Sequence, residues 1–315
     1  MGKFPKIWRG LSGGQQQALG QKLYLAGGGE NGGEEALKAL LDGDYEIILR
    51  DASKTLVDQY GRCIPPSGLK KGQVVDANRQ YRLVQPEIDY NTVLARITQY
   101  FPEMKFISAT EFKQRVEALL AKLDDQKQVK NLRRGVWLPI VLPQLAVTDY
   151  GRTLEEIFLA AVERSYTAQF PGRRFYNYRK GDLAGQVSVV EQSRHQQLID
   201  AMRQGPVVCI LFPAALQGFG IEADRQMIEE FPQGFALSGA IDTAMAHVVY
   251  AEVLARDYQV PVNDCAANTW QGPDHSLYFD SSDGKRCFGR RNLSAGEGYS
   301  GGVVLFECVH RTLGN

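Results

Sequence analysis

Cysteine is scarce in this sequence of 315 residues, which places five cysteines at positions 63, 209, 265, 287 and 308. The cysteines form no CxxC pair and follow no regular spacing, which argues against a disulfide framework and against a thiolate zinc site. An odd number of unpatterned cysteines is typical of a reducing compartment. We therefore expect a cytoplasmic protein without structural disulfides.

An excess of one charge is also absent, because 36 lysines and arginines balance 36 aspartates and glutamates. A net charge of zero gives no long-range field toward nucleic acid or anionic lipid, so such binding would need a local patch. The longest apolar stretch, 236–254, is interrupted by Asp242, His247 and Glu252. With no apolar segment near residue 1 either, we expect neither export nor a membrane partner.

Hydrophobic residues make up 44% of the sequence and charged residues 23%, as in globular proteins. Short apolar runs bounded by glycine and proline predict buried strands at 136–142 and 207–212. We expect a further buried strand at 302–310, and a hairpin whose strands, 277–280 and 285–288, flank an Asp-Gly turn. In the N-terminal portion the patterns predict a loop at 27–33, a helix at 34–41, a strand at 45–49, a hairpin at 74–84 and a helix at 91–101.

Several helix starts carry a capping signature, in which Ser or Thr precedes Glu by three residues. The pairs are Ser108 with Glu111, Thr153 with Glu156, and Ser188 with Glu191, and the helices are expected to end near Asp125, Gln169 and Gln204. Ser238 is expected to cap another helix that reaches about Arg256.

Together the elements predict an α/β fold, with a mixed sheet flanked by helices and a β-rich C-terminal end. The charged stretch 122–135 is the one candidate boundary. It would divide an N-terminal α/β portion, 1–130, from a main α/β domain, 131–315, unless both belong to one domain.

Signatures for nucleotide cofactors and metals are missing. The segment LSGGQQQ at 11–17 looks like the signature loop of ABC-type ATPases, but no GxxxxGK[ST] segment accompanies it. The histidines at 195, 247, 275 and 310 are scattered, and only Glu191 and His195 have helical spacing. We expect no cofactor and no metal.

A basic and aromatic stretch, RRFYNYRK at 173–180, has the composition of a platform for single-stranded nucleic acid, because cations meet phosphates and aromatic rings stack on bases. A second basic run, KRCFGRR, follows at 285–291. The alternative is that the aromatic residues pack beneath the charges. The candidate nucleic-acid-binding residues are Arg173, Arg174, Tyr176, Tyr178 and Arg179.

Cys265 and His275 are the best candidates for nucleophilic catalysis, because a thiol needs a nearby base to become a thiolate. The local sequence NDCAANTWQGPDHSLYF matches no usual cysteine-hydrolase neighbourhood. A buried Cys265 and a His275 on a loop are the alternative.

Asp242, His247 and Tyr250 share one predicted, otherwise apolar helix. A buried carboxylate must find hydrogen-bond donors or raise its pKa. These side chains either are satisfied in the core or line a ligand-binding pocket.

From Thr153 onward the sequence resembles uncharacterised proteins predicted from the genomes of candidate-phylum bacteria. The resemblance is carried by LEEIFLAAVERSYTAQFPGRRFYNYRKGDLAGQVSVVEQSRHQQLIDAMRQGPVVCILFP and then by ALQGF and GYSGGV, and it covers about half of the chain. It implies a cytosolic bacterial origin and brings no activity, cofactor or catalytic residue.

The primary hypothesis is a cytosolic, non-enzymatic binding or interaction protein with a small-molecule or protein partner. The alternatives are a hydrolase or transferase that uses Cys265 and His275, and single-stranded nucleic-acid binding through 173–180. Whether the protein is an enzyme stays open on the sequence alone.

Overall fold

A computed structural model describes residues 54–76, 81, 83–256 and 259–307, together with Leu23, Glu34 and Lys38. Contacts divide the chain into two units, residues 1–51 with 309–315 and residues 52–308. Every helix and strand named below belongs to the second unit. The boundary expected at 130/131 falls within that unit, whereas the elements expected at 27–33, 34–41 and 45–49 fall almost wholly outside the described residues.

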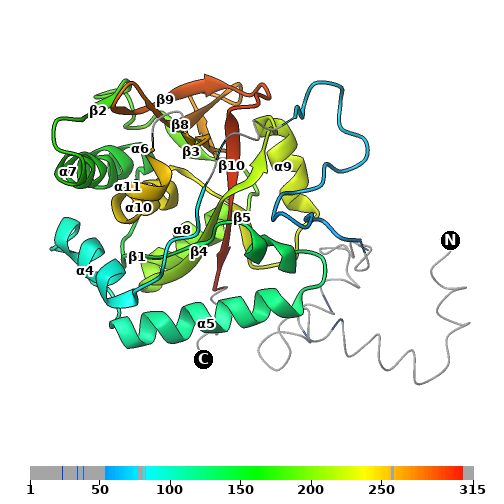
Figure 1. Cartoon of the computed structure of the whole chain (residues 1–315), viewed down its shortest axis with the longest axis horizontal. Helices are drawn as coiled ribbons and strands as arrows, with labels where there is room; N and C mark the ends of the chain where they lie inside the picture. The colour runs from blue at the N-terminus through cyan, green and yellow to red at the C-terminus, as the bar shows by residue number, and fades with distance from the viewer. Residues whose placement is uncertain are drawn as a thin grey trace, which may run out of the picture. The chain divides into compact units, whose positions relative to one another are not determined.

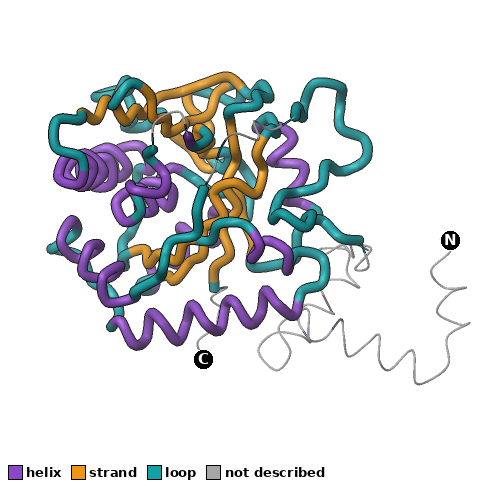
Figure 2. Tube along the Cα trace, viewed as in Figure 1, coloured by secondary structure: helices purple, strands orange, loops and turns teal. Residues whose placement is uncertain are grey.

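A mixed, eight-stranded sheet flanked by helices forms the core of this unit, which confirms the predicted α/β class (Figures 1 and 2). The strand order is β1-β4-β10-β6-β8-β9-β2, with β5 also paired to β10, and β3 and β7 form a separate two-stranded sheet. The strands are β1 (Leu138–Leu142), β2 (Arg174–Asn177), β3 (Val187–Val189), β4 (Val207–Gln217), β5 (Phe235–Leu237), β6 (Val262–Cys265), β7 (Asn268–Trp270), β8 (His275–Ser282), β9 (Lys285–Asn292) and β10 (Tyr299–Phe306). Strand β10 runs parallel to β6 and antiparallel to β4, and β2 runs parallel to β9.

The helices cover both faces of the sheet. They are α4 (Tyr90–Tyr100), α5 (Ala109–Asp125), the 3-10 helix η2 (Lys130–Arg134), α6 (Tyr150–Thr153), the π-helix η3 (Leu154–Leu159), α7 (Ala160–Gln169), α8 (His195–Gln204), α9 (Ile221–Glu229), α10 (Ala240–Val249) and α11 (Ala251–Leu254). Helix α10 packs against α7, α4 and β1, whereas α9 packs against β5 and β10 (Figure 1). Strand alternation explains this division, because Asn263 and Cys265 of β6 face α10 while Asp264 between them faces α9.

Helix α10 is the most deeply buried helix, since all ten of its residues are buried. A helix that is apolar on every side can be stable only inside a core. Within the described part of the chain, no helix has both the length and the hydropathy to cross a membrane. The apolar stretch 236–254 therefore belongs to the core of this unit. The charged residues that interrupt it had already argued against a membrane span.

The capping predictions succeed at one site and fail at others. The Ser108 hydroxyl accepts the Glu111 N–H at 3.2 Å, and α5 runs to Asp125 as predicted. Thr153 lies inside a helix that begins at Tyr150, because Asp149 provides the cap. Ser188 lies in β3, and the helix that ends at Gln204 begins only at His195.

The cap of α10 is Gly239 instead of Ser238, because the Asp242 carboxylate reaches back to the Gly239 N–H. At the C-terminal end the predictions hold better. Strands β8 and β9 form the predicted hairpin, with Asp283 and Gly284 at φ values of 52° and 70° in its turn. The hairpin expected at 74–84 lies partly outside the described residues, and Val74 forms a bridge to Phe219.

Candidate functional site

Cys265 and His275, the predicted nucleophile and base, lie on neighbouring strands without forming a catalytic pair. Cys265 is buried and lies near Thr243 of α10. Burial, followed by the charges of Asp242 and Asp264, raises the pKa of Cys265 well above its ordinary value, which opposes thiolate formation. His275 instead stands edge-on to Trp270, with ring centroids 6.3 Å apart. Among the described residues, no hydrogen bond joins the Cys265 thiol to His275.

Asp242 acts in the core as the cap of α10. Its Oδ1 accepts the Gly239 N–H at 2.9 Å and lies 3.8 Å from Nε2 of His195. Burial raises the pKa of Asp242 to about 8 and lowers the pKa of His195 to about 4. Near neutral pH the carboxyl group keeps its proton and the imidazole is uncharged, so the contact is between neutral groups.

Side chains from other elements close the N-terminal end of α10. The Asn268 side chain accepts the Ala240 N–H at 2.7 Å, and the Tyr150 hydroxyl accepts the Ile241 N–H at 3.1 Å. These bonds satisfy backbone donors that a ligand would otherwise use. The end of α10 is therefore occupied by the protein itself.

His247 and Tyr250, the other predicted ligand-binding residues, are also bound inside the core. Nε2 of His247 contacts Nη2 of Arg286, and burial, aided by that guanidinium, lowers the pKa of His247 well below its ordinary value. The Tyr250 hydroxyl donates to the Pro139 carbonyl at 2.8 Å. This geometry favours the core interpretation of the α10 residues.

Asp224 and Asp264 form a buried carboxyl pair between α9 and the sheet that the sequence analysis did not identify as a site. Asp264 pairs with Arg291 at 2.8 Å, and burial raises the pKa of Asp264 to about 6. Burial and the nearby charge of Asp264 raise the pKa of Asp224 well above its ordinary value. The one available signal was the position of Asp224 on the apolar stripe of α9, between Ile221 and Ile228.

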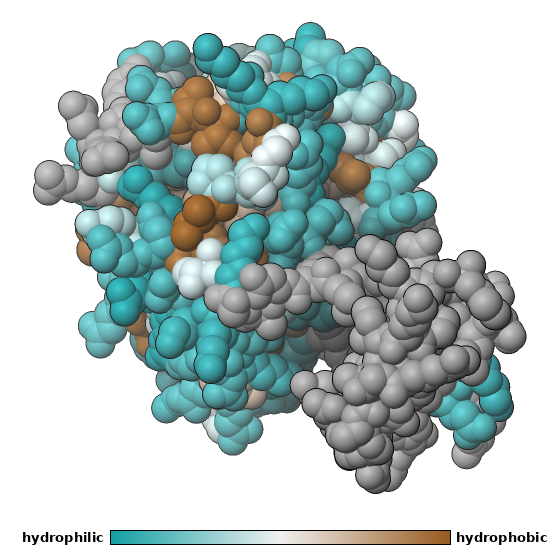
Figure 3. All heavy atoms as spheres, turned by 90° about the vertical axis from the view of Figure 1, so that its right-hand side faces the viewer, coloured by the Kyte–Doolittle hydropathy of each residue, from teal (hydrophilic) through white to brown (hydrophobic). Residues whose placement is uncertain are grey.

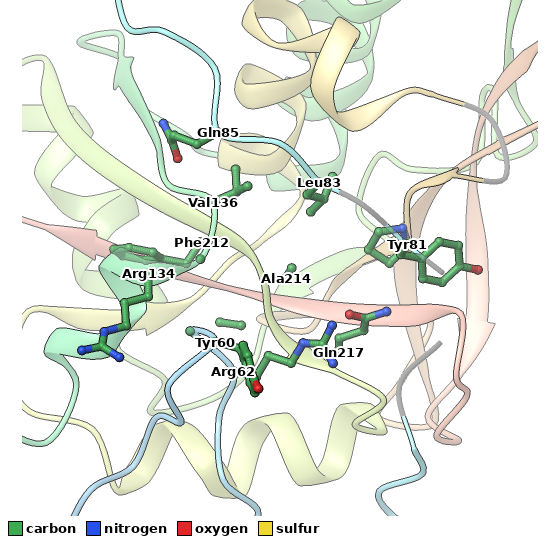
Figure 4. A pocket seen from close by; sticks show the side chains of 14 residues that line it. Tyr60, Arg62, Tyr81, Leu83, Gln85, Arg134, Val136, Phe212, Ala214 and Gln217 are labelled. Carbon is green, nitrogen blue, oxygen red and sulfur yellow. The ribbon is translucent and has the colours of Figure 1, made fainter. Parts of the chain in front are cut away.

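A pocket of about 220 Å³ lies where three segments meet the C-terminal half of β4 (Figure 4). We refer to it as the arginine pocket. It is lined by Tyr60, Gly61, Arg62, Tyr81, Leu83, Gln85, Arg134, Gly135, Val136, Phe212, Ala214, Ala215, Gln217 and Pro261. The segment 54–76, which supplies the wall at 60–62, lies on the right-hand side of the molecule in Figure 1, whereas the segment that begins at 83 crosses the middle of that view. Figure 3 shows the right-hand face as mainly hydrophilic, with separate apolar patches.

A tight turn presents Arg62 to the arginine pocket. A bridge between Val57 and Cys63 closes the turn, and the Asp58 carboxylate accepts the N–H groups of Tyr60 and Arg62 at 2.8 and 3.0 Å. Gly61 has a φ of +83°, and a Cβ there would lie 2.4 Å from the backbone nitrogen of Gly135. Only glycine fits, because the conformation is left-handed and the two backbones are in close approach.

Two further segments fix the other walls. The Gln85 side chain bonds both backbone groups of Trp137, at 2.9 and 3.0 Å, and so holds 83–85 beside 136–137. Helix η2 ends at Arg134, directly before Gly135. In Figure 4, Leu83 and Val136 lie above the space, Phe212 lies beside Arg134 at its left-hand rim, and Arg62 extends toward Gln217.

The charge of the arginine pocket is positive. Its lining contains Arg62 and Arg134 and no carboxylate. In the part of the chain that the structure describes, neither guanidinium forms an ion pair or hydrogen bond with another side chain. The pocket therefore offers unpaired donors suited to an anion, next to apolar and aromatic walls.

The predicted basic and aromatic residues at 173–180 divide between two environments. The Arg173 guanidinium lies over the Phe170 ring at 5.1 Å, and that of Arg179 lies over the Trp270 ring at 5.4 Å. Tyr176 and Tyr178 stack on each other, with Tyr178 54% exposed. The two basic runs of the sequence meet, because β2 pairs with β9.

Comparison with known proteins gives no match to a family model, to a curated protein or to a solved structure. No sequence motif marked the arginine pocket, whose arginines stand in a turn beside Gly61 and at the end of η2 beside Gly135.

Proposed function

We propose that the protein is a non-enzymatic binding protein whose partner is a small anionic molecule held in the arginine pocket. The observation that carries the proposal is that Arg62 and Arg134, neither of which pairs with a carboxylate among the described residues, line one pocket from different sides (Figure 4). Arg62 and Arg134 would bind a phosphate or carboxylate group, for which the planar guanidinium has matching hydrogen-bond geometry. Phe212, Leu83 and Val136 would contact an apolar or aromatic part of the same ligand.

The size of the pocket restricts the ligand. Its volume of about 220 Å³ is below the range of roughly 300–1,000 Å³ that is typical of drug-sized ligands. A single ring or short apolar chain that carries one anionic group fits this space. The lining contributes hydroxyl, amide and guanidinium groups but no carboxylate, histidine or thiol, which supports binding over turnover.

The proposed compartment is the cytosol. Cys63, Cys209, Cys265 and Cys287 are free and buried thiols. Free cysteines are typical of a reducing environment. Recovery of the protein from a membrane fraction or a secreted fraction of cells would contradict the proposed location.

The test is isothermal titration calorimetry, which compares the affinities for phenyl phosphate, inorganic phosphate and the neutral amide benzamide. We expect phenyl phosphate to bind most tightly, because it combines the anion with an apolar ring. Arg62→Gln should lower the affinity for phenyl phosphate by about tenfold or more, because a charge-assisted hydrogen bond is lost. Arg133→Gln is the matched control, since Arg133 pairs with Asp124 outside the pocket.

Two results would contradict the proposal. One is equal affinity for benzamide and phenyl phosphate, which would mean that the guanidiniums do not select an anion. The other is phenyl phosphate binding that is unchanged in Arg62→Gln, which would place the ligand elsewhere.

A further inference from the structure

Three tyrosines lie together on the outer face of the sheet, the face opposite α10. Tyr176 of β2 pairs with Cys287 of β9, and Tyr278 of β8 pairs with Gly289 of β9. Because β6 pairs Asp264 with Tyr278, and Asp264 faces α9, strand alternation places these tyrosines on that same face.

Tyr178 extends this row beyond the end of β2. Its N–H donates to the Phe288 carbonyl at 3.0 Å, and its hydroxyl lies 3.8 Å from Sγ of Cys287. Its ring stacks on Tyr176 with centroids 6.3 Å apart and planes 17° apart. Tyr178 is 54% exposed, so the outer side of its ring is open to solvent.

Gly289 allows Tyr278 to lie across the strand. A Cβ at Gly289 would come 3.0 Å from the Tyr278 hydroxyl oxygen, so the absence of a side chain there leaves space for the ring. The result is a shallow aromatic surface over β2, β9 and β8. We refer to Arg174, Tyr176, Tyr178, Tyr278 and Lys285 together as the tyrosine surface.

Cations stand at one end of the tyrosine surface. Arg174 and Lys285 occupy paired positions in β2 and β9, on the same face as Tyr176. Arg174 is exposed and Lys285 is partly exposed, and neither forms an ion pair with another described residue. Asp264 on this face pairs with Arg291, and Asp280 lies opposite Cys287. Among the described residues of these strands, Arg174 and Lys285 therefore outnumber the carboxylate that has no such partner.

We propose that the tyrosine surface binds a short single strand of nucleic acid. Unpaired bases would stack on the exposed ring of Tyr178 and on the partly exposed ring of Tyr278, and phosphates would meet Arg174 and Lys285. Stacking rings beside cations recognise single strands with little sequence preference, because every base has a π face. A duplex keeps its bases inside and presents no face to the rings.

The structure changes the residues assigned to this activity. Arg173 and Arg179 rest on Phe170 and Trp270, whereas Tyr278 and Lys285 join the surface from outside 173–180. The charge of the local surface supplies the complementarity that the neutral whole chain lacks. This inference does not depend on the arginine pocket, which uses none of these residues.

The test measures fluorescence anisotropy with labelled 12-nucleotide oligo(U) and oligo(dT) and with a duplex of equal length. We expect both single strands to bind at low salt and the duplex to bind at least tenfold more weakly. Contacts to two phosphates predict a slope of about −1.4 for log affinity against log salt, and Arg174→Gln should reduce the magnitude of that slope by about 0.7.

Variants at Tyr178 separate stacking from charge. Tyr178→Ala should weaken binding by about tenfold, whereas Tyr178→Phe should keep it, because the ring is what stacks. Tyr60→Ala is the matched control, since Tyr60 is 68% exposed and lies at the arginine pocket. It should leave oligonucleotide binding unchanged, and Tyr178→Ala should leave phenyl phosphate binding unchanged.

Three outcomes would overturn the inference: no oligonucleotide binding at low salt, a duplex that binds as tightly as the single strands, or Tyr178→Ala with unchanged affinity. Each of these can occur whether or not phenyl phosphate binds. Failure of the tyrosine surface is thus distinguishable from failure of the arginine pocket.

Discussion

Polar side chains have opposite environments in two regions of the molecule, around α10 and in the arginine pocket. Around α10, Asp242, His195 and Arg286 are buried, and each has a backbone hydrogen-bond partner, at Gly239, Leu237 and Leu254 respectively. In the arginine pocket, Arg62 and Arg134 have room around them and no partner among the described residues. Side-chain chemistry alone does not mark a site. A candidate site is marked by polar side chains that are accessible and that have no partner inside the protein.

The largest effect that we predict belongs to the α10 region. Arg286→Met should lower the free energy of unfolding by about 3 kcal/mol, because the Leu254 carbonyl, the Ser281 hydroxyl and His247 all lose a buried partner. Urea denaturation measures the change. Arg290→Met, at an exposed position further along the same strand, should cost at most about 1 kcal/mol. Similar costs for both variants would contradict the contrast.

Gly61→Ala should have the next largest effect, on the pocket side of the comparison. The added Cβ meets the Gly135 backbone and adopts a strained φ, so we expect a loss of about 2 kcal/mol together with loss of phenyl phosphate binding. Gly68→Ala is the control, since its φ is +98° and no atom lies within 4 Å. If thermal unfolding showed equal losses, the close approach of Gly61 and Gly135 would be unimportant.

Asp242→Asn should change how stability depends on pH. The pKa of Asp242 is raised to about 8 in the folded protein, above its ordinary value of 3.8, so the folded state holds a proton that the unfolded state releases. Stability from this proton is complete below pH 4 and is lost as the pH rises toward 8, by up to about 1.4 kcal/mol per pH unit. Denaturant titrations from pH 4 to 9 should show a flatter curve for the variant, and an unchanged slope would mean that Asp242 is ionised in the fold.

The smallest effect on stability should come from Arg62→Gln. Because this guanidinium has no partner in the described fold, we expect a change within about 0.5 kcal/mol alongside the loss of anion binding. Differential scanning calorimetry of the free protein would measure it. A large destabilisation would show that Arg62 is structural, like Arg286.

Local patterns predicted the elements that depend on local interactions. The Ser108 cap, the Asp-Gly hairpin turn and the buried runs in β1 and β4 are properties of short segments, and each appears where the sequence indicated. The capping predictions at Ser188 and Thr153 were wrong. Ser188 pairs with β7 as part of a strand, and Asp149 caps the helix before Thr153. Tertiary competition of this kind is invisible to a local motif.

The candidate sites were harder to predict for the same reason. The arginine pocket joins residues near 60, 134 and 215, which no window of sequence contains together. The tyrosine surface was foreseen in part, because Tyr176 and Tyr178 stood beside arginines. Its other members depend on the register that sets Tyr278 and Lys285 next to β2.

The turn at Asp283 and Gly284 also bears on the order in which the sheet assembles. Strands β8 and β9 pair over their whole length and are joined by two residues with positive φ, which suits the twist of a hairpin. Such hairpins form within about 1–10 μs, whereas β1, β4 and β10 must bring distant segments together. We expect pulsed hydrogen exchange to show the amides of β8 and β9 protected first, so that this hairpin serves as the template on which β2 and β6 add.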